Sequence, residues 1–195
     1  MKTICVFCGS SMGSRPVYRE KAREFGKLLA RKNIDLVYGG SNIGLMRVLA
    51  DTVMEFGSKA IGVMPDNLVK REVAHRGITK LHIVGSMHER KALMAELSDA
   101  FVVFPGGFGT LDEMFEMLTW IQLNLVEKPC GILNINGYYD QLLQFLDHCV
   151  EEQFIRFEHR ANVIVDTDME CLLEKLLDFQ PTHVEKWIDR LKEMG

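Results

Sequence analysis

Residues 100–123 read AFVVFPGGFGTLDEMFEMLTWIQL: an apolar run, a glycine-rich turn and a longer run of mixed character. Ala100–Phe104 is apolar throughout, which is typical of a strand that is buried on both faces. After the glycines of the turn, the apolar residues recur at the spacing of a helix. The stretch therefore predicts a strand, a tight turn and a helix over Thr110–Leu123.

The same unit recurs along the chain. The other predicted strands are Thr3–Phe7, Asp35–Tyr38, Lys59–Met64, Ile78–Val84, Cys130–Ile135 and Asn162–Val165. The other predicted helices are Pro16–Lys32, Gly44–Phe56, Met87–Leu97, Tyr138–Glu152, Asp168–Phe179 and, at the C-terminus, Thr182–Met194.

Strands that alternate with helices and are apolar on both faces indicate a parallel sheet covered by helices on both sides. We therefore predict an α/β fold, a Rossmann-like doubly wound parallel sheet of about seven strands. A closed barrel is disfavoured, because it needs eight strands and a chain longer than 195 residues. No linker or repeat divides the sequence, so residues 1–195 are predicted to form a single domain, with the helix at about 182–194 packing on it or on a partner.

The charge balance narrows the possible partners. The chain has 23 basic and 27 acidic residues and a formal net charge of −4. A nucleic-acid or anionic-membrane surface needs a sustained basic patch, so neither partner is predicted. We find no signal peptide and no apolar run long enough to span a membrane, and the expected location is the cytoplasm.

Five cysteines are an odd number in a chain of a size that needs no disulfides. Cys5 and Cys8 form a C-x-x-C, but they lie in or at the end of the first predicted strand, without a second Cys or His pair nearby. A zinc or thioredoxin-like site is the less favoured interpretation, and buried free thiols are predicted.

Glycine-rich turns follow three predicted strands, at the edge where an open parallel sheet binds its ligands. Glycine lets backbone N–H groups approach a ligand closely, and Thr110 is predicted to offer an N-cap hydroxyl to a helix whose dipole favours phosphate. Ordinary tight turns are the alternative. Neither a P-loop nor a G-x-G-x-x-G after the first strand is present, so the turns favour a mononucleotide or sugar phosphate. The turns are Gly9–Ser11, Gly39–Gly44 and Gly106–Thr110.

Three carboxylates stand on the helix after Thr110, which is otherwise strongly apolar. Glu113 and Glu116 are three apart and share a face. Acids in the first turn complement the helix dipole, which accounts for Asp112 and Glu113 but poorly for Glu116. The helix is predicted to lie between the sheet and another surface, such as a second subunit. Its predicted apolar stripe is Leu111, Met114, Phe115, Leu118 and Ile121.

Arg90 and Lys91 stand near the start of a predicted helix, where cations oppose the helix dipole. Solvated surface cations are one interpretation. Close to the glycine turn and the carboxylates, they would instead complete a site with donors for an anion on one side and acids on the other. Such a site suits hydrolysis of a bond next to a phosphorylated sugar.

These residues carry a resemblance. The segment PGGFGTLDE at residues 105–113 is similar to the PGGxGTxxE signature of the Lonely Guy family of cytokinin-activating phosphoribohydrolases. The likeness extends over nearly the whole chain. It includes CGSS (residues 8–11), YGGSNIGLM (38–46), MHERK (87–91), TWIQL (119–123) and NINGYYDQLLQF (134–145).

The resemblance implies hydrolysis of the N-glycosidic bond of a nucleoside 5′-monophosphate, to free base and ribose 5-phosphate. It implies that Arg90 and Glu113 are the catalytic pair and that substrate contacts fall on Glu72, Lys91, the Gly107–Thr110 backbone and Thr119. Arg47 stands where the family commonly has glycine, so the resemblance does not define the exact shape of the neighbouring turn, whereas the catalytic residues are unaffected by this departure. The full set of predicted substrate- and phosphate-binding residues is Gly9, Ser10, Gly40, Ser41, Glu72, Met87, Lys91, Gly106, Gly107, Gly109, Thr110, Glu116 and Thr119.

Physical chemistry agrees with this activity. Cleavage of a ribosyl C–N bond builds positive charge on the sugar, which an ionised Glu113 can stabilise while it orients or deprotonates water. Arg90 is expected either to hold the phosphate or to stabilise the departing purine. Glu116 is expected either to bind the ribose hydroxyls or to orient Arg90. No metal or cofactor is predicted. The protein is predicted to form a homodimer. The alternatives are a nucleotide-binding sensor or carrier without turnover, and an enzyme that transfers the base or the ribosyl group to an acceptor other than water. The preferred base, adenine or an N6-prenylated adenine, stays open.

Overall fold

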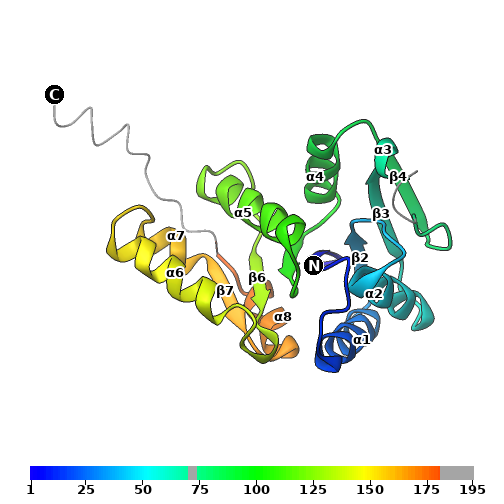
Figure 1. Ribbon diagram of the computed structural model, residues 1–195, viewed down its shortest axis with the longest axis horizontal. Helices are drawn as coiled ribbons and strands as arrows, with labels where there is room; N and C mark the ends of the chain where they lie inside the picture. Colours follow the sequence, from blue (N-terminus) through cyan, green and yellow to red (C-terminus); the bar gives the residue numbers. More distant parts are fainter. Residues whose placement is uncertain (70–73, 181–195) are drawn as a thin grey trace.

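The computed structural model of the protein describes residues 1–69 and 74–180. Seven parallel strands form one sheet in the order β4-β3-β2-β1-β5-β6-β7 (Figure 1). The predicted Rossmann-like α/β class is confirmed, and each predicted strand is present with its ends shifted by no more than two residues. The strands are β1 (Thr3–Phe7), β2 (Asp35–Tyr38), β3 (Ala60–Pro65), β4 (Lys80–Val84), β5 (Ala100–Val103), β6 (Cys130–Leu133) and β7 (Val163–Asp166).

The order of the strands reverses next to β1. The chain builds outward from β1 through β2 and β3 to β4, and then returns to add β5 on the other side of β1. Cys5 pairs with Phe101, so the carboxyl ends of β1 and β5 lie side by side. The N–H of Gly9 donates to the carbonyl of Pro105 at 3.1 Å and joins the turns that follow these two strands. This reversal is the position at which open α/β sheets bind ligands.

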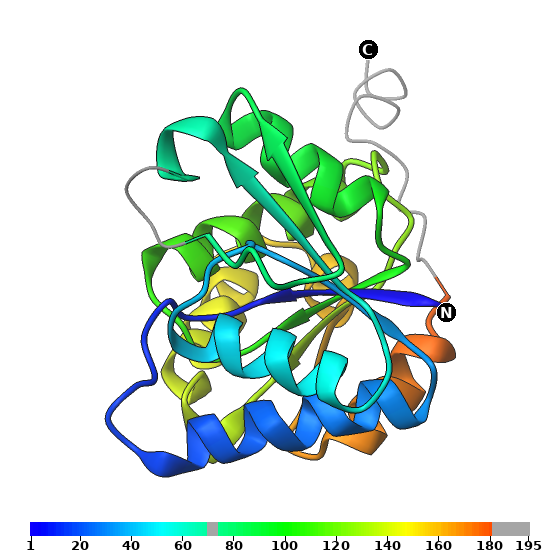
Figure 2. The same ribbon diagram turned by 90° about the vertical axis from the view of Figure 1, so that its right-hand side faces the viewer.

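Helices cover both faces of the sheet (Figure 2). One apolar core packs α1, α2 and α8 against the sheet, and a second core packs α4 and α5 against its other face. The longer helices are α1 (Pro16–Arg31), α2 (Gly44–Glu55), α4 (Met87–Glu96), α5 (Phe108–Gln122), α6 (Asp140–Glu151) and α8 (Met169–Leu177). Three short helices are not predicted by the sequence: α3 (Asp66–Val69), the 3-10 turn Ile135–Gly137 and α7 (Phe157–Ala161).

Helix α5 begins two residues earlier than predicted. Gly107 is its N-cap and makes no side-chain cap, so the predicted N-cap role of Thr110 is wrong. Thr110 is the third helical residue and is buried, because Gly106, which has no Cβ, leaves room for its side chain. A threonine near the start of a helix is compatible with the N-cap position and with the first helical turn. The sequence therefore did not define where α5 begins, because this depends on the conformation of the preceding glycines.

The apolar stripe of α5 is also only partly as predicted. Met114 and Ile121 are buried, but Phe115 is exposed at 37%, and Met117 is buried in its place. Residues three and four apart share a face only approximately over four turns, so the sequence did not separate these positions. The predicted helix Thr182–Met194 lies outside the described residues.

The cysteine prediction is confirmed. Cys5 and Cys8 are buried free thiols on and after β1. Burial raises the pKa of the Cys8 thiol well above its usual range, and the negative charge of Glu113 adds to that shift. Among residues 1–69 and 74–180, no helix combines the length and the apolar character needed to cross a membrane.

Candidate active site

A cavity of about 260 Å³ lies at the reversal of strand order, above the carboxyl ends of β1 and β5. The turn after β1, the turn after β2 and the first residues of α4 and α5 surround it. Its lining residues are Val6, Cys8, Gly9, Ser10, Gly39, Met46, Met64, Leu68, Met87, Arg90, Gly107, Phe108, Gly109, Thr110 and Glu113.

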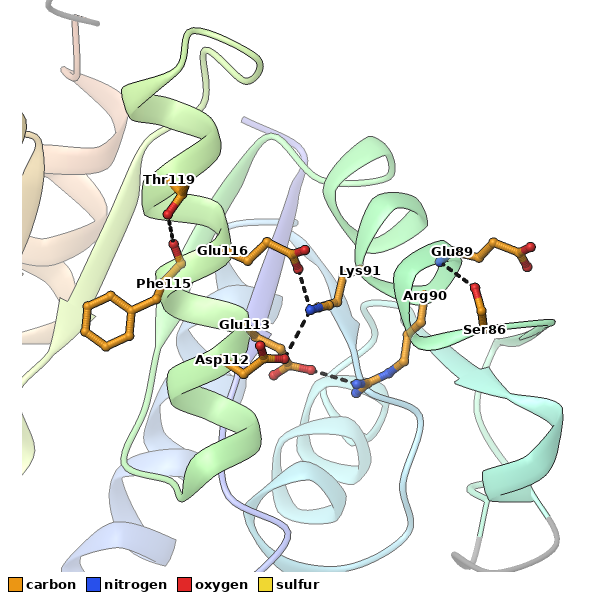
Figure 3. Close-up of polar contacts among 9 residues, drawn as sticks. All are labelled: Ser86, Glu89, Arg90, Lys91, Asp112, Glu113, Phe115, Glu116 and Thr119. Atoms are coloured by element: carbon orange, nitrogen blue, oxygen red, sulfur yellow. Dashed lines mark hydrogen bonds and ion pairs between the residues drawn. The ribbon is translucent and has the colours of Figure 1, made fainter.

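The start of α4 is fixed by two side chains. Ser86 is the N-cap, and its hydroxyl accepts a hydrogen bond from the N–H of Glu89 at 3.1 Å. The Glu89 carboxylate reaches back and accepts from the N–H of Gly85 at 2.7 Å. This reciprocal arrangement resembles a capping box and sets the first turn of the helix. Arg90 and Lys91 follow directly and extend toward α5 (Figure 3).

Arg90 and Glu113 form an ion pair inside the cavity (Figure 3). One terminal nitrogen of Arg90 lies 2.8 Å from Glu113 Oε1, and the two side chains are 12% and 9% exposed. Arg90 Nε also donates to the carbonyl of Val63 at 3.0 Å. Behind the guanidinium lies Gly39, where an added Cβ would overlap the other terminal nitrogen. The guanidinium is therefore held from three sides.

Burial governs the ionisation of Glu113. It raises the pKa of the carboxyl above its ordinary value, and the positive charge of Arg90 opposes this shift. A carboxylate with few surrounding waters and one cation interacts strongly with a positive charge that develops beside it, because water screens the interaction weakly there. The pair thus places a buried carboxyl group beside a guanidinium that can donate to an anion.

Lys91 pairs with the other two carboxylates of α5 (Figure 3). Its ammonium lies 3.1 Å from Asp112 Oδ2 and 2.7 Å from Glu116 Oε2. Partial burial lowers the pKa of Lys91, but the hydrogen bonds and charges of Glu116 and Asp112 outweigh it and raise the pKa overall. These three residues do not line the cavity. They hold α4 against α5 and so support the Arg90–Glu113 pair.

The N-terminus of α5 forms another part of the cavity wall. Gly107, Phe108 and Gly109 are exposed and line the cavity. The first N–H groups of a helix have no partner within the helix and carry the positive end of its dipole. This wall therefore suits a phosphate, whereas the wall with Arg90 and Glu113 suits the reacting atoms.

The structure brings most of the predicted site residues together. Those that line the cavity are Gly9, Ser10, Met87, Arg90, Gly107, Gly109, Thr110 and Glu113. Gly106 adjoins it in the same turn. Ser41 is fully buried, and neither it nor Gly40 reaches the cavity. Glu72 lies outside the described residues.

Thr119 lies elsewhere. It is nine positions past Thr110, about 13 Å further along the helix axis. Its hydroxyl donates to the carbonyl of Phe115 at 2.7 Å (Figure 3). Thr119 lines a separate groove between α5, α6 and α7.

Sequence reasoning missed the apolar wall of the cavity. Met46, Met64 and Leu68 come from α2, β3 and α3. Gly39 also lines the cavity, whereas its neighbour Gly40 is the residue that the sequence predicts. Position at a strand end could have indicated Gly39 and Met64, since both stand at or after the carboxyl end of a strand. Methionine offers a polarisable apolar surface, which suits a flat base.

The fold and the site define the class: an α/β protein of Rossmann-like topology with a cavity of about 260 Å³ at the reversal of strand order. A protein-family model described as "possible lysine decarboxylase" matches residues 46–176. Two plant relatives are similar over most of the chain. The cytokinin riboside 5′-monophosphate phosphoribohydrolase LOG1 of Arabidopsis thaliana is 46% identical over 93% of this chain and 85% of its own. The probable cytokinin riboside 5′-monophosphate phosphoribohydrolase LOGL2 of rice, Oryza sativa subsp. japonica, is 44% identical over 98% and 78%.

The chain belongs to this family, the Lonely Guy phosphoribohydrolases. More distant solved structures share its fold. One is the molybdenum cofactor binding protein of Rippkaea orientalis, with a TM-score of 0.66 and 21% identity over 89% of this chain and 94% of its own. Another is the molybdenum cofactor carrier protein of Chlamydomonas reinhardtii, with a TM-score of 0.66 and 21% identity over 91% and 99%.

Proposed function

We propose that the protein hydrolyses the N-glycosidic bond of a nucleoside 5′-monophosphate, AMP or an N6-modified cytokinin riboside monophosphate. The products are the free base and ribose 5-phosphate. The observation that carries the proposal is the buried Arg90–Glu113 pair, which shares one cavity with the exposed start of α5. The family membership of the chain supports the same reaction.

The phosphate is assigned to the backbone N–H groups between Gly107 and Thr110. Glu113 then faces the sugar, where the C1′–N bond breaks and positive charge develops on the ribose. Water supplies the oxygen that bonds to C1′, and Glu113 orients this water and accepts its proton. The bonding electrons leave with the base, which takes up a proton from solvent at the departing nitrogen, and Glu113 then returns to solvent the proton that it accepted.

Arg90 is assigned to the departing base. It is paired with Glu113 at 2.8 Å, so a carboxylate that faces the sugar holds the guanidinium next to the bond between sugar and base. A guanidinium next to the base stabilises the negative charge that builds on the departing nitrogen. Lys91 and Glu116 are assigned a supporting role, because their pairing holds α4 and α5 in place.

The test is incubation of the pure protein with AMP and, separately, with isopentenyladenosine monophosphate. Release of free base with an equal amount of ribose 5-phosphate is expected, and the better substrate identifies the base. Tight binding of either nucleotide without release of base would contradict the proposal and indicate a sensor or carrier.

The pH dependence of kcat/KM follows from Glu113. Only the ionised carboxylate accepts a proton from water, so activity rises with pH as Glu113 loses its proton. Burial raises the pKa of Glu113, and the midpoint of this rise is therefore expected above the ordinary glutamate pKa of about 4.3. A rate profile that is flat across this region, or one that falls as pH increases through it, would contradict the role of base.

We further propose a homodimer formed through the face of α5, α6 and α7. Each of these helices carries an exposed phenylalanine, at 37% (Phe115), 59% (Phe145) and 72% (Phe157), and Phe154 between α6 and α7 is exposed at 86%. Exposed apolar patches of this kind mark interaction surfaces. Thr119 lines the groove on the same face, so a substrate contact by Thr119 would require the partner subunit.

Light scattering after size exclusion is expected to give twice the chain mass of 22.3 kDa for the wild type. The Phe157→Glu variant is expected to give the mass of a single chain. A monomeric wild type would exclude the dimer. The cytoplasm is the proposed location. Free thiols on Cys5, Cys8 and Cys130 are typical of a reducing compartment.

A further inference from the structure

The turn between β2 and α2 forms the wall behind Arg90. Gly39 lines the cavity, and a Cβ added to it would overlap the guanidinium and lie 3.0 Å from the sulfur of Met46. The backbone of the turn is thus in direct contact with the side chain assigned to the departing base. Any displacement of the turn changes the space that Arg90 occupies beside Glu113.

This turn is held from outside the cavity by His75. The N–H of His75 donates to the carbonyl of Gly40 at 2.9 Å, and Ser41 forms an antiparallel bridge with Ala74. Gly40 has a φ of +78°, a conformation that other residues rarely adopt. The hydrogen bond from His75 therefore fixes the carbonyl of the residue at which the turn bends.

His75 is in turn fixed by Asp51. Its Nε2 lies 2.8 Å from Asp51 Oδ1, and the His75 side chain is 10% exposed. Asp51 belongs to α2, the helix into which the turn leads. The contacts therefore close a ring from the turn along α2 to Asp51, across to His75, and back to Gly40. A closed ring of this kind resists movement of the turn relative to the helix.

Two buried hydroxyls lie in the segment that the ring holds, one at the end of β2 and one in the turn. The hydroxyls of Tyr38 and Ser41 are buried, and neither has a hydrogen-bond partner among residues 1–69 and 74–180. A buried hydroxyl without a partner costs about 1–3 kcal/mol. Burial raises the pKa of Tyr38, and the charge of Asp51 adds to the shift, which places Asp51 close to Tyr38. Opening of the turn to water would relieve the cost of these hydroxyls, and the His75–Asp51 pair opposes such opening.

We propose that Asp51 and His75 are positioning residues for Arg90: together they hold the Gly39–Gly40 turn against the guanidinium and so keep it paired with Glu113. This inference rests on the proposed function for its kinetic consequence. It also has a structural consequence, the order of the Arg90 side chain, which is measurable without any turnover.

The kinetic test compares Asp51→Ala and His75→Ala with the wild type. Each is expected to lower kcat about tenfold, because a small misplacement of a reacting group costs at least that much, with little change in KM. Asp51→Asn keeps an oxygen acceptor for His75, so this variant is expected to retain most of the wild-type kcat that Asp51→Ala loses. Arg47→Ala is the matched control. Arg47 pairs with the other oxygen of Asp51 at 3.2 Å, and its removal is expected to leave kcat unchanged.

The second readout is the NMR signal of the Arg90 Nε–H group, which donates to Val63 and is assigned by its loss in Arg90→Lys. In Asp51→Ala and His75→Ala this signal is expected to shift and its proton to exchange faster with water, whereas Arg47→Ala leaves both unchanged. His75→Phe, which keeps the ring volume, replaces the alanine variants if these do not fold.

An Arg90 signal that does not respond to the Asp51 and His75 variants overturns the inference, whether or not the wild type releases base. The inference is also overturned if kcat falls as much in Arg47→Ala as in Asp51→Ala and His75→Ala. Loss of any charged group on α2 would then explain the effect, without the contact between Asp51 and His75. A wild type without base release, but with the expected response of the Arg90 signal, contradicts the proposed function alone.

Discussion

Replacement of Glu113 with glutamine is expected to lower kcat about a thousandfold, with a much smaller change in KM. Glutamine keeps the shape of the side chain and can still accept a hydrogen bond from Arg90. It cannot take a proton from water or balance the positive charge that develops on the ribose. The loss therefore falls on the transition state and not on the binding of the nucleotide. Steady-state rates of base release from the better nucleotide substrate measure it.

A matched control is Glu55→Gln. Glu55 is an exposed carboxylate that pairs with Arg23 at 3.0 Å, at a distance from the cavity, and its replacement is expected to leave kcat unchanged.

Glu113→Ala adds a test of stability. It leaves the buried Arg90 charge without its partner and is expected to lower the free energy of unfolding by about 3 kcal/mol, measured by urea titration. Full activity of Glu113→Gln would remove the proposed mechanism.

Replacement of Arg90 with lysine is expected to lower kcat about a hundredfold, although the positive charge is kept. The guanidinium donates to Val63 and pairs with Glu113 at the same time, while a third nitrogen lies against Gly39. A single ammonium cannot meet these directions together, so arginine and lysine are not interchangeable here.

The kinetic pattern of Arg90→Lys also decides between the two roles that the sequence leaves open. If Arg90 serves the departing base, kcat falls and the affinity for ribose 5-phosphate, measured by calorimetry, stays within about twofold. If Arg90 instead holds the phosphate, that affinity falls and KM rises while kcat changes little. Arg23→Lys on α1 serves as the control for a change of the same kind at an exposed ion pair.

The class of fold was predictable because its signal is local. A strand buried on both faces must be apolar along its whole length, and a helix on a sheet must repeat its apolar residues every three or four positions. Both patterns are readable in TICVF and in the run after Pro16. The edge strand β4 is half-exposed, and its predicted start at Ile78 was two residues too early.

The location of the site was predictable for a related reason. The parallel arrangement sends every glycine turn that follows a strand to the same edge of the sheet, so Gly9 and Gly107 had to lie near one another. The roles of Arg90 and Glu113 came from the resemblance to the family, and they stay predictions until the variants are measured.

Local sequence patterns are sufficient to predict the alternation of strands and helices, the edge of the sheet that carries the site and the residue types available there. Which of those residues meet depends on how the elements pack in three dimensions. Arg90 and Glu113 stand on different helices, Asp51 reaches His75 from a third, and Thr119 turns away from the cavity although it shares a helix with Glu113. Periodicity assigns a residue to a face within its own element, whereas the distance between two elements depends on how their side chains pack across the sheet.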